Sequence, residues 1–223
     1  MGKVGQRVYC AGPLFNPAER EEMAAIASAL KAGGYSVFLP QEDGVRFADL
    51  IPILMERGIS LDEASKMLNM AIFSLDVFEI IHCNGLVVNI NGRVPDEGAM
   101  VEAGIAWSHN KTVVIFKSDD RSLIHGSCNP LVMGLADFEF VSTYGEIARA
   151  FDRKLGGVHA PGHFTFSSRF ETANAKGEAI SRCLAKRRDA REIGELLITL
   201  FGEELCLGRE DPNESFSPVL GQQ

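Results

Sequence analysis

Short apolar runs alternate along the chain with stretches in which hydrophobic residues recur every three or four positions. This alternation is typical of a parallel sheet whose strands are joined by helices. The apolar runs predict five strands, at residues 7–11, 35–39, 85–90, 112–117 and 138–142. We therefore expect an α/β fold with a five-stranded parallel sheet.

Helix-start and helix-stop residues separate these strands. Asn16 followed by Pro17 is typical of a helix N-terminus, and Gly33-Gly34 of a helix end. Ser60 and Glu63 have the spacing of a capping box, which predicts a helix within 58–83. Two more helices are expected at about 98–109 and 144–155.

The character of the sequence changes after Gly156. Loop-like Gly, Pro and Ser residues are followed by a charged amphipathic stretch at 173–201 and a tail rich in Pro and Gly. In a chain of 223 residues this favours one main domain with an appendage. We expect an α/β domain at 1–156 and a C-terminal extension at 157–223, with one long helix and a loose tail.

Composition excludes several classes of protein. Hydrophobic residues make up 46% and charged residues 23%, the balance of a globular protein. The net charge of −8 has the wrong sign for nucleic acid or an anionic membrane surface. No apolar run approaches the ~20 residues that span a bilayer, and the N-terminus lacks a signal-peptide core, so a cytoplasmic location is expected. His159 and His163 have a metal-like spacing but no third ligand, so no metal site is expected.

Ligands of parallel α/β proteins bind beyond the carboxyl ends of the strands. The segments expected there, 12–16, 41–44, 89–96 and 118–121, are acidic and rich in amides. They match neither the Gly-x-Gly-x-x-Gly dinucleotide fingerprint nor the P-loop pattern. A neutral ligand that carries hydroxyl groups fits this edge better than a dinucleotide.

Glu102 is the most informative residue of the chain. It lies in an otherwise apolar predicted helix, where Gly98, Ala99, Ile105 and Ala106 are its neighbours three and four positions away. An unpaired buried carboxylate costs several kcal/mol or has a raised pKa. Glu102 is therefore either an exposed charge on a half-buried helix or a nucleophile or general base in a cleft lined by small residues.

Three further residues allow both a structural and a functional interpretation. Asp96 is placed to cap the helix of Glu102, Asp76 could be an exposed charge near a helix end, and Tyr9 could be a core aromatic. Several carboxylates at one edge would suit glycosyl transfer, in which one forms a sugar ester and another handles the proton of the leaving group. Glu79 is interpreted as a solvated helix charge.

Three segments together resemble the nucleoside 2-deoxyribosyltransferase family, over about residues 7–145. They are Tyr9-Cys10-Ala11-Gly12-Pro13-Leu14-Phe15-Asn16-Pro17, the helix that carries Asp76, and Asp96-Glu97-Gly98-Ala99-Met100-Val101-Glu102-Ala103-Gly104. The resemblance implies a flavodoxin-like three-layer sandwich. It also implies an enzyme that moves 2-deoxyribose between purine or pyrimidine bases, with no cofactor.

The resemblance implies a role for each motif residue. Glu102 would be the nucleophile, Tyr9 would orient it, Asp76 would contact or protonate the base, and Asp96 would bind deoxyribose hydroxyls. Asn129 resembles an asparagine that family members contribute to a neighbouring subunit, which implies a homo-oligomer with sites near subunit interfaces. The expected partners are 2′-deoxynucleosides and free nucleobases, and the remaining substrate contacts would come from Gly12, Pro13, Phe15, Asn16, Asn91 and Gly98.

Two alternatives to a deoxyribosyltransferase remain. The first is hydrolysis of deoxynucleosides or deoxynucleoside 5′-monophosphates, although Asp96 would repel phosphate and Arg93 is the only cation seen near it. The second is a non-catalytic nucleoside-binding module, because a fold alone does not determine function. Residues 157–223 have no counterpart in the resemblance, and residues 43–60 are interpreted as a variable substrate loop.

Overall fold

A parallel sheet forms the centre of the molecule. The computed structural model describes residues 5–92, 94–119, 128–155, 168–186 and 189–203. The sheet contains β1 (Arg7–Ala11), β2 (Ser36–Phe38), β3 (Gly85–Asn89) and β4 (Thr112–Phe116) in the order β2-β1-β3-β4. The order reverses direction at β1, so the carboxyl ends of β1 and β3 lie at the switch point where ligands bind in such folds.

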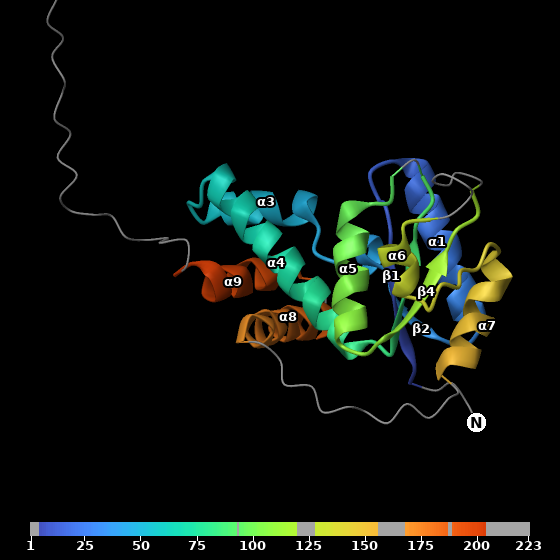
Figure 1. Cartoon of the computed structure of the whole chain (residues 1–223). Helices are drawn as coiled ribbons and strands as arrows, with labels where there is room; N and C mark the ends of the chain where they lie inside the picture. Colours follow the sequence, from blue (N-terminus) through green and yellow to red (C-terminus); the bar gives the residue numbers. More distant parts are fainter. Residues whose placement is uncertain (1–4, 93, 120–127, 156–167, 187–188, 204–223) are drawn as a thin grey trace, which may run out of the picture.

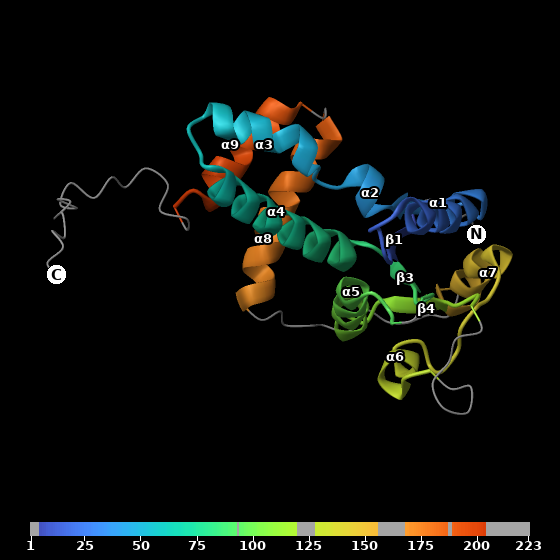
Figure 2. The ribbon, with the colours of Figure 1, turned by 90° about the horizontal axis from the view of Figure 1, so that it is seen from above.

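Helices cover both faces of the sheet, as Figures 1 and 2 show. On one face, α1 (Pro17–Ala32) and α7 (Tyr144–Leu155) pack against the side chains of Val8 and Cys10. On the other face, α4 (Leu61–His82) and α5 (Glu97–Ser108) pack against those of Tyr9 and Ala11. Successive residues of a strand point to opposite faces, so the alternation in β1 builds both cores of a three-layer sandwich.

The predicted helix boundaries agree closely with the structure. Asn16 caps α1 and Ser60 caps α4, each in a capping box with the glutamate three residues on. Residues 144–155 form α7 as expected. These boundaries depend on local hydrogen bonds between a side chain and the nearby backbone, which is why the sequence alone predicts them.

The fifth strand expected at 138–142 is not part of the sheet. In this segment a single bridge pairs Val141 with Phe116, where Val141 donates to the Ile115 carbonyl at 2.9 Å. Asp137 and Phe138 have φ values of 58° and 64°, which bend the chain away from β4 just before that point. The left-handed backbone, which an apolar pattern does not reveal, limits pairing to one residue.

The segment expected to be a substrate loop is largely helical. This segment, 43–60, begins at the last residue of α2 (Pro40–Asp43) and contains α3 (Phe47–Glu56), with Pro52 inside α3. Proline removes a backbone donor and is unusual inside a helix, so the sequence gives little indication of α3. Burial of Leu50 and Leu54 stabilises α3 despite the proline.

The C-terminal region forms two helices instead of the single long one expected. They are α8 (Ser168–Lys186) and α9 (Ala190–Phe201), and Asp189 caps α9 through a hydrogen bond from the Arg191 amide at 2.9 Å. Figure 2 shows α8 crossing α4, and a side chain at Gly177 would clash with the backbone of Ser74 at that crossing. Gly177 therefore permits a close approach of the two helices.

The C-terminal helices share the core of the sheet domain. Ile180 of α8 and Leu197 and Phe201 of α9 belong to the same buried cluster as Tyr9. The boundary expected at 156 lies in 156–167, outside the described residues, and the division into 1–156 and 157–223 stays a prediction. A short helix, α6 (Pro130–Gly134), follows β4. Among the described helices, none has both the length and the apolar character needed to cross a membrane.

Candidate active site

A tyrosine on β1 and a glutamate on α5 make a direct hydrogen bond beneath the switch point. The Tyr9 hydroxyl donates to Oε1 of Glu102 at 2.7 Å. Tyr9 is fully buried, and its ring stacks on Phe38 at a centroid distance of 5.4 Å. The core packing of the ring therefore fixes the position of the hydroxyl, which in turn orients the glutamate.

Small residues on α5 bring Glu102 close to the sheet. Ala99, Ala103 and Ala106 are buried on the same helix and let its backbone approach the strands. The pKa of Glu102 is raised to about 8, mainly because the carboxyl is buried and also because Asp76 and Asp96 lie nearby, while the Tyr9 hydroxyl opposes the rise. Glu102 is therefore not an exposed helix charge.

Asp76 of α4 faces the same hydroxyl. Burial raises its pKa to about 7, an effect that the hydrogen bond of Tyr9 opposes and the charge of Glu79 reinforces. Its charge also raises the pKa of Glu102, and both carboxyls raise the pKa of the Tyr9 hydroxyl. Two partly buried carboxyls thus converge on one tyrosine, an arrangement in which a proton can be held near neutral pH.

Glu79, one turn further along α4, points to a different environment. Its side chain is buried and forms an ion pair with Arg7 at 2.5 Å, and it accepts a hydrogen bond from the Ser181 hydroxyl at 2.7 Å. The interpretation of Glu79 as a solvated helix charge is wrong. Its role is structural, because it joins α4 to β1 and α8.

Asp96 both caps a helix and faces the cavity. Its Oδ2 accepts a hydrogen bond from the Ala99 amide at 2.7 Å, which makes it the N-cap of α5. Asp96 also lines the cavity that contains Asp76 and Glu102. Capping leaves its second oxygen, Oδ1, available to a ligand, so the structural and functional interpretations are compatible.

The cavity has a volume of about 720 Å³, within the range of small-molecule sites. It opens at the carboxyl ends of β1 and β2 and is walled by α2, α3, α4 and α5. Its lining combines carboxylates with apolar side chains and two arginines. The lining residues are Cys10, Gly12, Leu14, Phe15, Arg20, Pro40, Gln41, Gly44, Val45, Arg46, Phe47, Ile72, Leu75, Asp76, Asp96, Gly98 and Glu102.

Three of the seven residues predicted to bind substrate line this cavity, namely Gly12, Phe15 and Gly98. Phe15 is 81% exposed, so its ring is free to cover a ligand at the rim. At Gly12 a side chain would clash with Met23 of α1, so this glycine is also required for packing.

The other four do not line the cavity of their own chain, and their contact with substrate stays a prediction. The amide of Asn16 caps α1. Asn91 donates to Glu22 at 2.7 Å and accepts from the Ser118 amide at 2.8 Å, so it joins the loop after β3 to α1 and to the loop after β4. Pro13 lies in the same loop as Gly12, and Asn129 is exposed and caps α6 through the Leu131 amide at 2.9 Å.

No individual site role was predicted for three polar residues of the cavity wall, although Gln41 lies in the expected ligand segment 41–44 and Arg46 in the expected substrate loop 43–60. Arg20 donates to the Leu14 carbonyl at 3.0 Å, and Arg46 pairs with Asp49 at 3.1 Å. Gln41 donates to the Arg20 carbonyl at 3.1 Å, while its Oε1 is buried with no hydrogen-bond partner in the described structure. Position directly after β2 was the available signal for Gln41, because the carboxyl end of each strand faces the cavity.

Two sequence observations lie outside the described residues. His159 and His163 fall within 156–167, and Arg93 is a single undescribed position. Over the described residues, no three His, Cys, Asp or Glu side chains form a group that could hold a metal ion. The expectation that the protein needs no cofactor stays a prediction.

The fold and the site together define a class, a parallel α/β protein with acidic side chains and a tyrosine at its switch point. The sequence model described as nucleoside 2-deoxyribosyltransferase matches residues 8–176, well over half of the chain. The chain therefore belongs to the nucleoside 2-deoxyribosyltransferase family, whose members are glycosyl transferases or N-glycosidases that act on nucleosides and nucleobases.

Solved structures resemble the chain at low sequence identity. A conserved protein from Enterococcus faecalis is 20% identical with a TM-score of 0.50, and the match covers 67% of this chain and 98% of that one. The 2-deoxyribosyltransferase from Bacillus psychrosaccharolyticus is 18% identical with a TM-score of 0.46, over 64% of this chain and 90% of that one. A CMP N-glycosidase from Clostridium botulinum is 17% identical with a TM-score of 0.36, over 67% and 99%. No curated protein matches the sequence.

Proposed function

We propose that the protein is a nucleoside 2-deoxyribosyltransferase that moves 2-deoxyribose between nucleobases through a covalent ester on Glu102. The observation that carries this proposal is the 2.7 Å hydrogen bond from Tyr9 to Glu102 inside a cavity that also contains Asp76 and Asp96. A tyrosine fixed in the core orients one oxygen of the glutamate, and the other is available to attack a sugar carbon.

In the first half of the reaction an ionised Glu102 attacks C1′ of the deoxynucleoside. A new bond forms between a carboxylate oxygen and C1′, and the glycosidic C1′–N bond breaks. The electron pair of that bond goes to the base nitrogen, and Asp76 supplies the proton for the departing base. The pKa of Asp76, raised to about 7, keeps this carboxyl partly protonated at neutral pH, as a general acid requires.

In the second half a new base attacks C1′ of the deoxyribosyl ester. The ester C1′–O bond breaks, its electron pair returns to the Glu102 carboxylate, and the incoming base loses its N–H proton to Asp76. Each half inverts C1′, so the configuration of the product is that of the starting nucleoside. Both carboxyls end in their initial states, ready for another cycle.

The remaining cavity residues fit the rest of a nucleoside. We assign the deoxyribose hydroxyls to the free oxygen of Asp96, close to Gly98, where the absence of a side chain lets a sugar approach the backbone of α5. The base would lie between Phe15 and the aliphatic wall of Ile72 and Leu75. Gln41, with its unpaired Oε1, would accept a hydrogen bond from an amino or imino group of the base.

The decisive experiment supplies a 2′-deoxynucleoside with and without a second free base and separates the products by chromatography. We expect a new deoxynucleoside with the wild type and a loss of roughly 10³-fold or more in Glu102→Gln. Glu97→Gln, an exposed glutamate on the same helix, is the matched control and should retain full activity. A deoxyribosyl adduct on Glu102, found by mass spectrometry when no acceptor is present, would identify the intermediate.

The cavity lining also favours a second candidate, hydrolysis of deoxynucleoside 5′-monophosphates. Arg20 and Arg46 line the same cavity as Asp96. The expectation that Arg93 is the only cation near a substrate phosphate is therefore wrong. Release of base and sugar phosphate regardless of acceptor would support this candidate. If wild type and Glu102→Gln bind nucleosides equally and neither turns them over, the protein is instead a binding module.

We further propose that the active form is a homo-oligomer in which Asn129 reaches the site of a neighbouring copy. Asn129 does not line the cavity of its own chain, and Leu131, whose amide it caps, is 83% exposed. Mixing Asn129→Ala with Glu102→Ala tests this arrangement. Mixed oligomers should regain activity, because they contain sites with both an intact Glu102 and a neighbour's Asn129. A monomeric mass in solution or absence of rescue would contradict it.

A further inference from the structure

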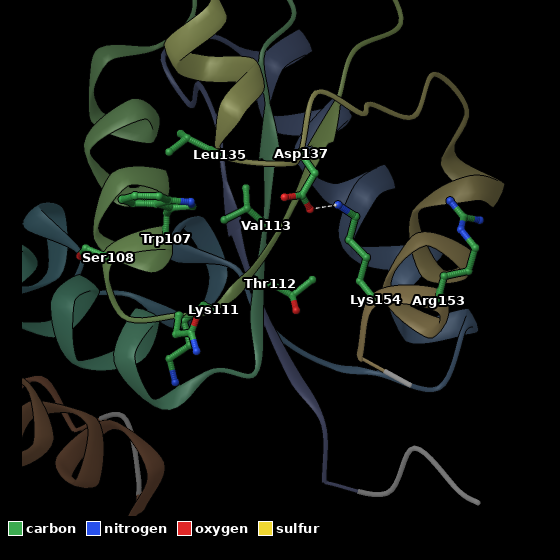
Figure 3. Close-up of a pocket in the computed structure, with 10 residues that line it drawn as sticks. Trp107, Ser108, Lys111, Thr112, Val113, Leu135, Asp137, Arg153 and Lys154 are labelled. Carbon is green, nitrogen blue, oxygen red and sulfur yellow. Dashed lines mark hydrogen bonds and ion pairs between the residues drawn. The ribbon is translucent and has the colours of Figure 1, made fainter. Parts of the chain in front are cut away.

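A second cavity lies at the other end of α5, and it shares no lining residue with the first. Its volume is about 530 Å³. Figure 3 shows it over the first residues of β4, with Trp107 and Leu135 on one side of Val113 and the Asp137–Lys154 pair on the other. Ser108, Asn110, Lys111, Thr112 and Arg153 complete the lining. None of these residues has a role in the proposed reaction.

The second cavity is basic although the protein is acidic. Three cations, Lys111, Arg153 and Lys154, line it together with one carboxylate, Asp137, which leaves a formal charge of +2. The whole chain has a net charge of −8. A local excess of cations on an acidic protein attracts small anions to this position.

Lys154 already forms hydrogen bonds and ion pairs with other residues of the chain. Its ammonium donates to the Ala136 carbonyl at 3.2 Å and to Asp137 at 2.9 Å, and Glu139 lies 3.7 Å away. These contacts hold the segment that carries Asp137 against α7. Lys154 therefore builds one wall of the cavity and is only partly available to a ligand.

Lys111 and Arg153 are different, because within the described residues neither side chain has a carboxylate or hydrogen-bond partner. Lys111 is half-buried, and burial lowers its pKa. The charge that acts on it is that of the Cys83 thiol, whose own pKa is raised to about 12, so at neutral pH no anion compensates the ammonium. A half-buried cation without a counter-ion is stabilised when an anion binds beside it.

The rest of the cavity is suited to a flat apolar group. Trp107 is 59% exposed, and the buried Val113 and the partly buried Leu135 line the cavity with it. An exposed indole face provides a stacking surface for a planar ring. β4 is an edge strand, and in the described structure its outer edge is paired only from Ile115 onward, so backbone groups nearer its start remain available for hydrogen bonds.

We propose that this cavity is a second binding site for a small organic phosphate that carries a planar ring. Lys111 and Arg153, which Figure 3 places on opposite sides of the start of β4, attract the phosphate, and the ring stacks on Trp107. The site is independent of the deoxyribosyl transfer proposed above, since it lies at the opposite end of α5.

Trp107 supplies the readout, because it is the single tryptophan of the chain. Its fluorescence is followed while the full-length protein is titrated with adenosine 5′-monophosphate, adenosine or inorganic phosphate. We expect saturable quenching by the monophosphate and at least tenfold weaker binding of adenosine, which lacks the anion. Inorganic phosphate should compete without quenching, because it lacks the ring.

Variants separate this site from the active site. Lys111→Met and Arg153→Gln should each weaken monophosphate binding roughly tenfold. Lys66→Met, an exposed lysine of α4, and Arg149→Gln, one turn earlier on α7, should leave it unchanged. Glu102→Gln should also bind normally, so failure of the catalytic proposal would not affect this result.

Three outcomes would overturn the proposal. They are the absence of saturable quenching by the monophosphate, equal affinity for adenosine, and unchanged affinity in the Lys111→Met and Arg153→Gln double variant. Thermal melting of each variant in the absence of ligand checks that any lost binding does not come from unfolding.

Discussion

The two cavities at the ends of α5 are opposites in charge. The cavity near its N-terminus contains Asp76, Asp96 and Glu102, whereas the one near its C-terminus contains Lys111 and Arg153. The helix dipole favours this distribution, because Asp96 caps the positive end and Lys111 follows the negative end. One short helix thus separates an environment suited to neutral nucleosides from one suited to anions.

Burial acts on both cavities but in opposite directions. It raises the pKa values of the Asp76 and Glu102 carboxyls and lowers that of the Lys111 ammonium, because a charged form is disfavoured in each case. In the acidic cavity the result is a proton that can be exchanged near neutral pH. In the basic cavity the result is a half-buried ammonium, that of Lys111, which a bound anion would stabilise. Four experiments test this comparison.

The largest effect is expected for Asp76→Asn, which removes the proposed proton donor. Activity should fall about 10²- to 10³-fold, the usual contribution of a general acid. The wild-type kcat/KM should peak between about pH 7 and 8, because Glu102 must be ionised and Asp76 protonated. In the variant, kcat/KM should no longer fall at alkaline pH. The acidic limb should move to lower pH, because the charge of Asp76 no longer raises the pKa of Glu102. Asp62→Asn, exposed on the same helix, is the control.

Tyr9→Phe should reduce kcat about tenfold, since it removes one hydrogen bond to a charged group. The Tyr9 hydroxyl lowers the pKa of Glu102, so its loss should move the acidic limb of the pH profile upward. Tyr35→Phe is a matched control, because Tyr35 donates to Asp152 at the same distance of 2.7 Å, away from the cavity. An unchanged pH profile in Tyr9→Phe would show that the tyrosine does not position the nucleophile.

Glu102→Gln should be more stable than the wild type at alkaline pH. The folded-state pKa of Glu102, about 8, lies above the ordinary glutamate value of 4.5, so the folded protein binds the proton more tightly than the unfolded chain. Stability of the wild type should therefore decrease between about pH 4.5 and 8, and the variant should lack that decrease. Denaturant unfolding should give a difference on the order of 2 kcal/mol at pH 9 and little at pH 5. A constant difference across this range would contradict burial of the charge.

The smallest effect is expected for Lys111→Met in the basic cavity. Burial lowers the pKa of Lys111, so the unfolded chain binds this proton more tightly, and the cost to the folded state persists until the pH rises past the lowered pKa. Because the side chain is only half-buried, the variant should be more stable by less than about 1 kcal/mol at pH 7. The difference should shrink toward pH 10. Adenosine 5′-monophosphate should stabilise the wild type and not the variant.

The sequence alone predicted much of the local structure. Asn16, Ser60 and their capping glutamates located the starts of α1 and α4, and β1 was placed with its observed bounds. It did not predict the bend at Asp137 and Phe138, which removes the fifth strand from the sheet. Capping and strand patterns depend on neighbours in the chain, whereas that bend depends on a backbone conformation no residue type there requires.

The candidate site shows the same division. Glu102 was notable from sequence because a carboxylate without a nearby cation is unusual in an apolar helix, and the motifs around Tyr9, Asp76 and Asp96 resembled one family. The roles of Glu79 and Arg20 were not predictable, whereas Gln41 lay in a segment expected at the ligand-binding edge. Glu79 is 72 positions from its partner Arg7 and 102 from Ser181, and such contacts have no local signal.

By itself, therefore, the sequence determined the fold class and most helix boundaries, because hydrophobic period and capping chemistry act over a few residues. Its motifs also pointed to the residues proposed for glycosyl transfer. Only the tertiary structure decided that Asp76 and Glu102 converge on Tyr9 whereas Glu79 pairs with Arg7. It also decided where the proposed anion-binding cavity forms. Those outcomes depend on burial and on distances between residues far apart in the chain. The same composition of charges can therefore produce an acidic and a basic cavity at the two ends of one helix.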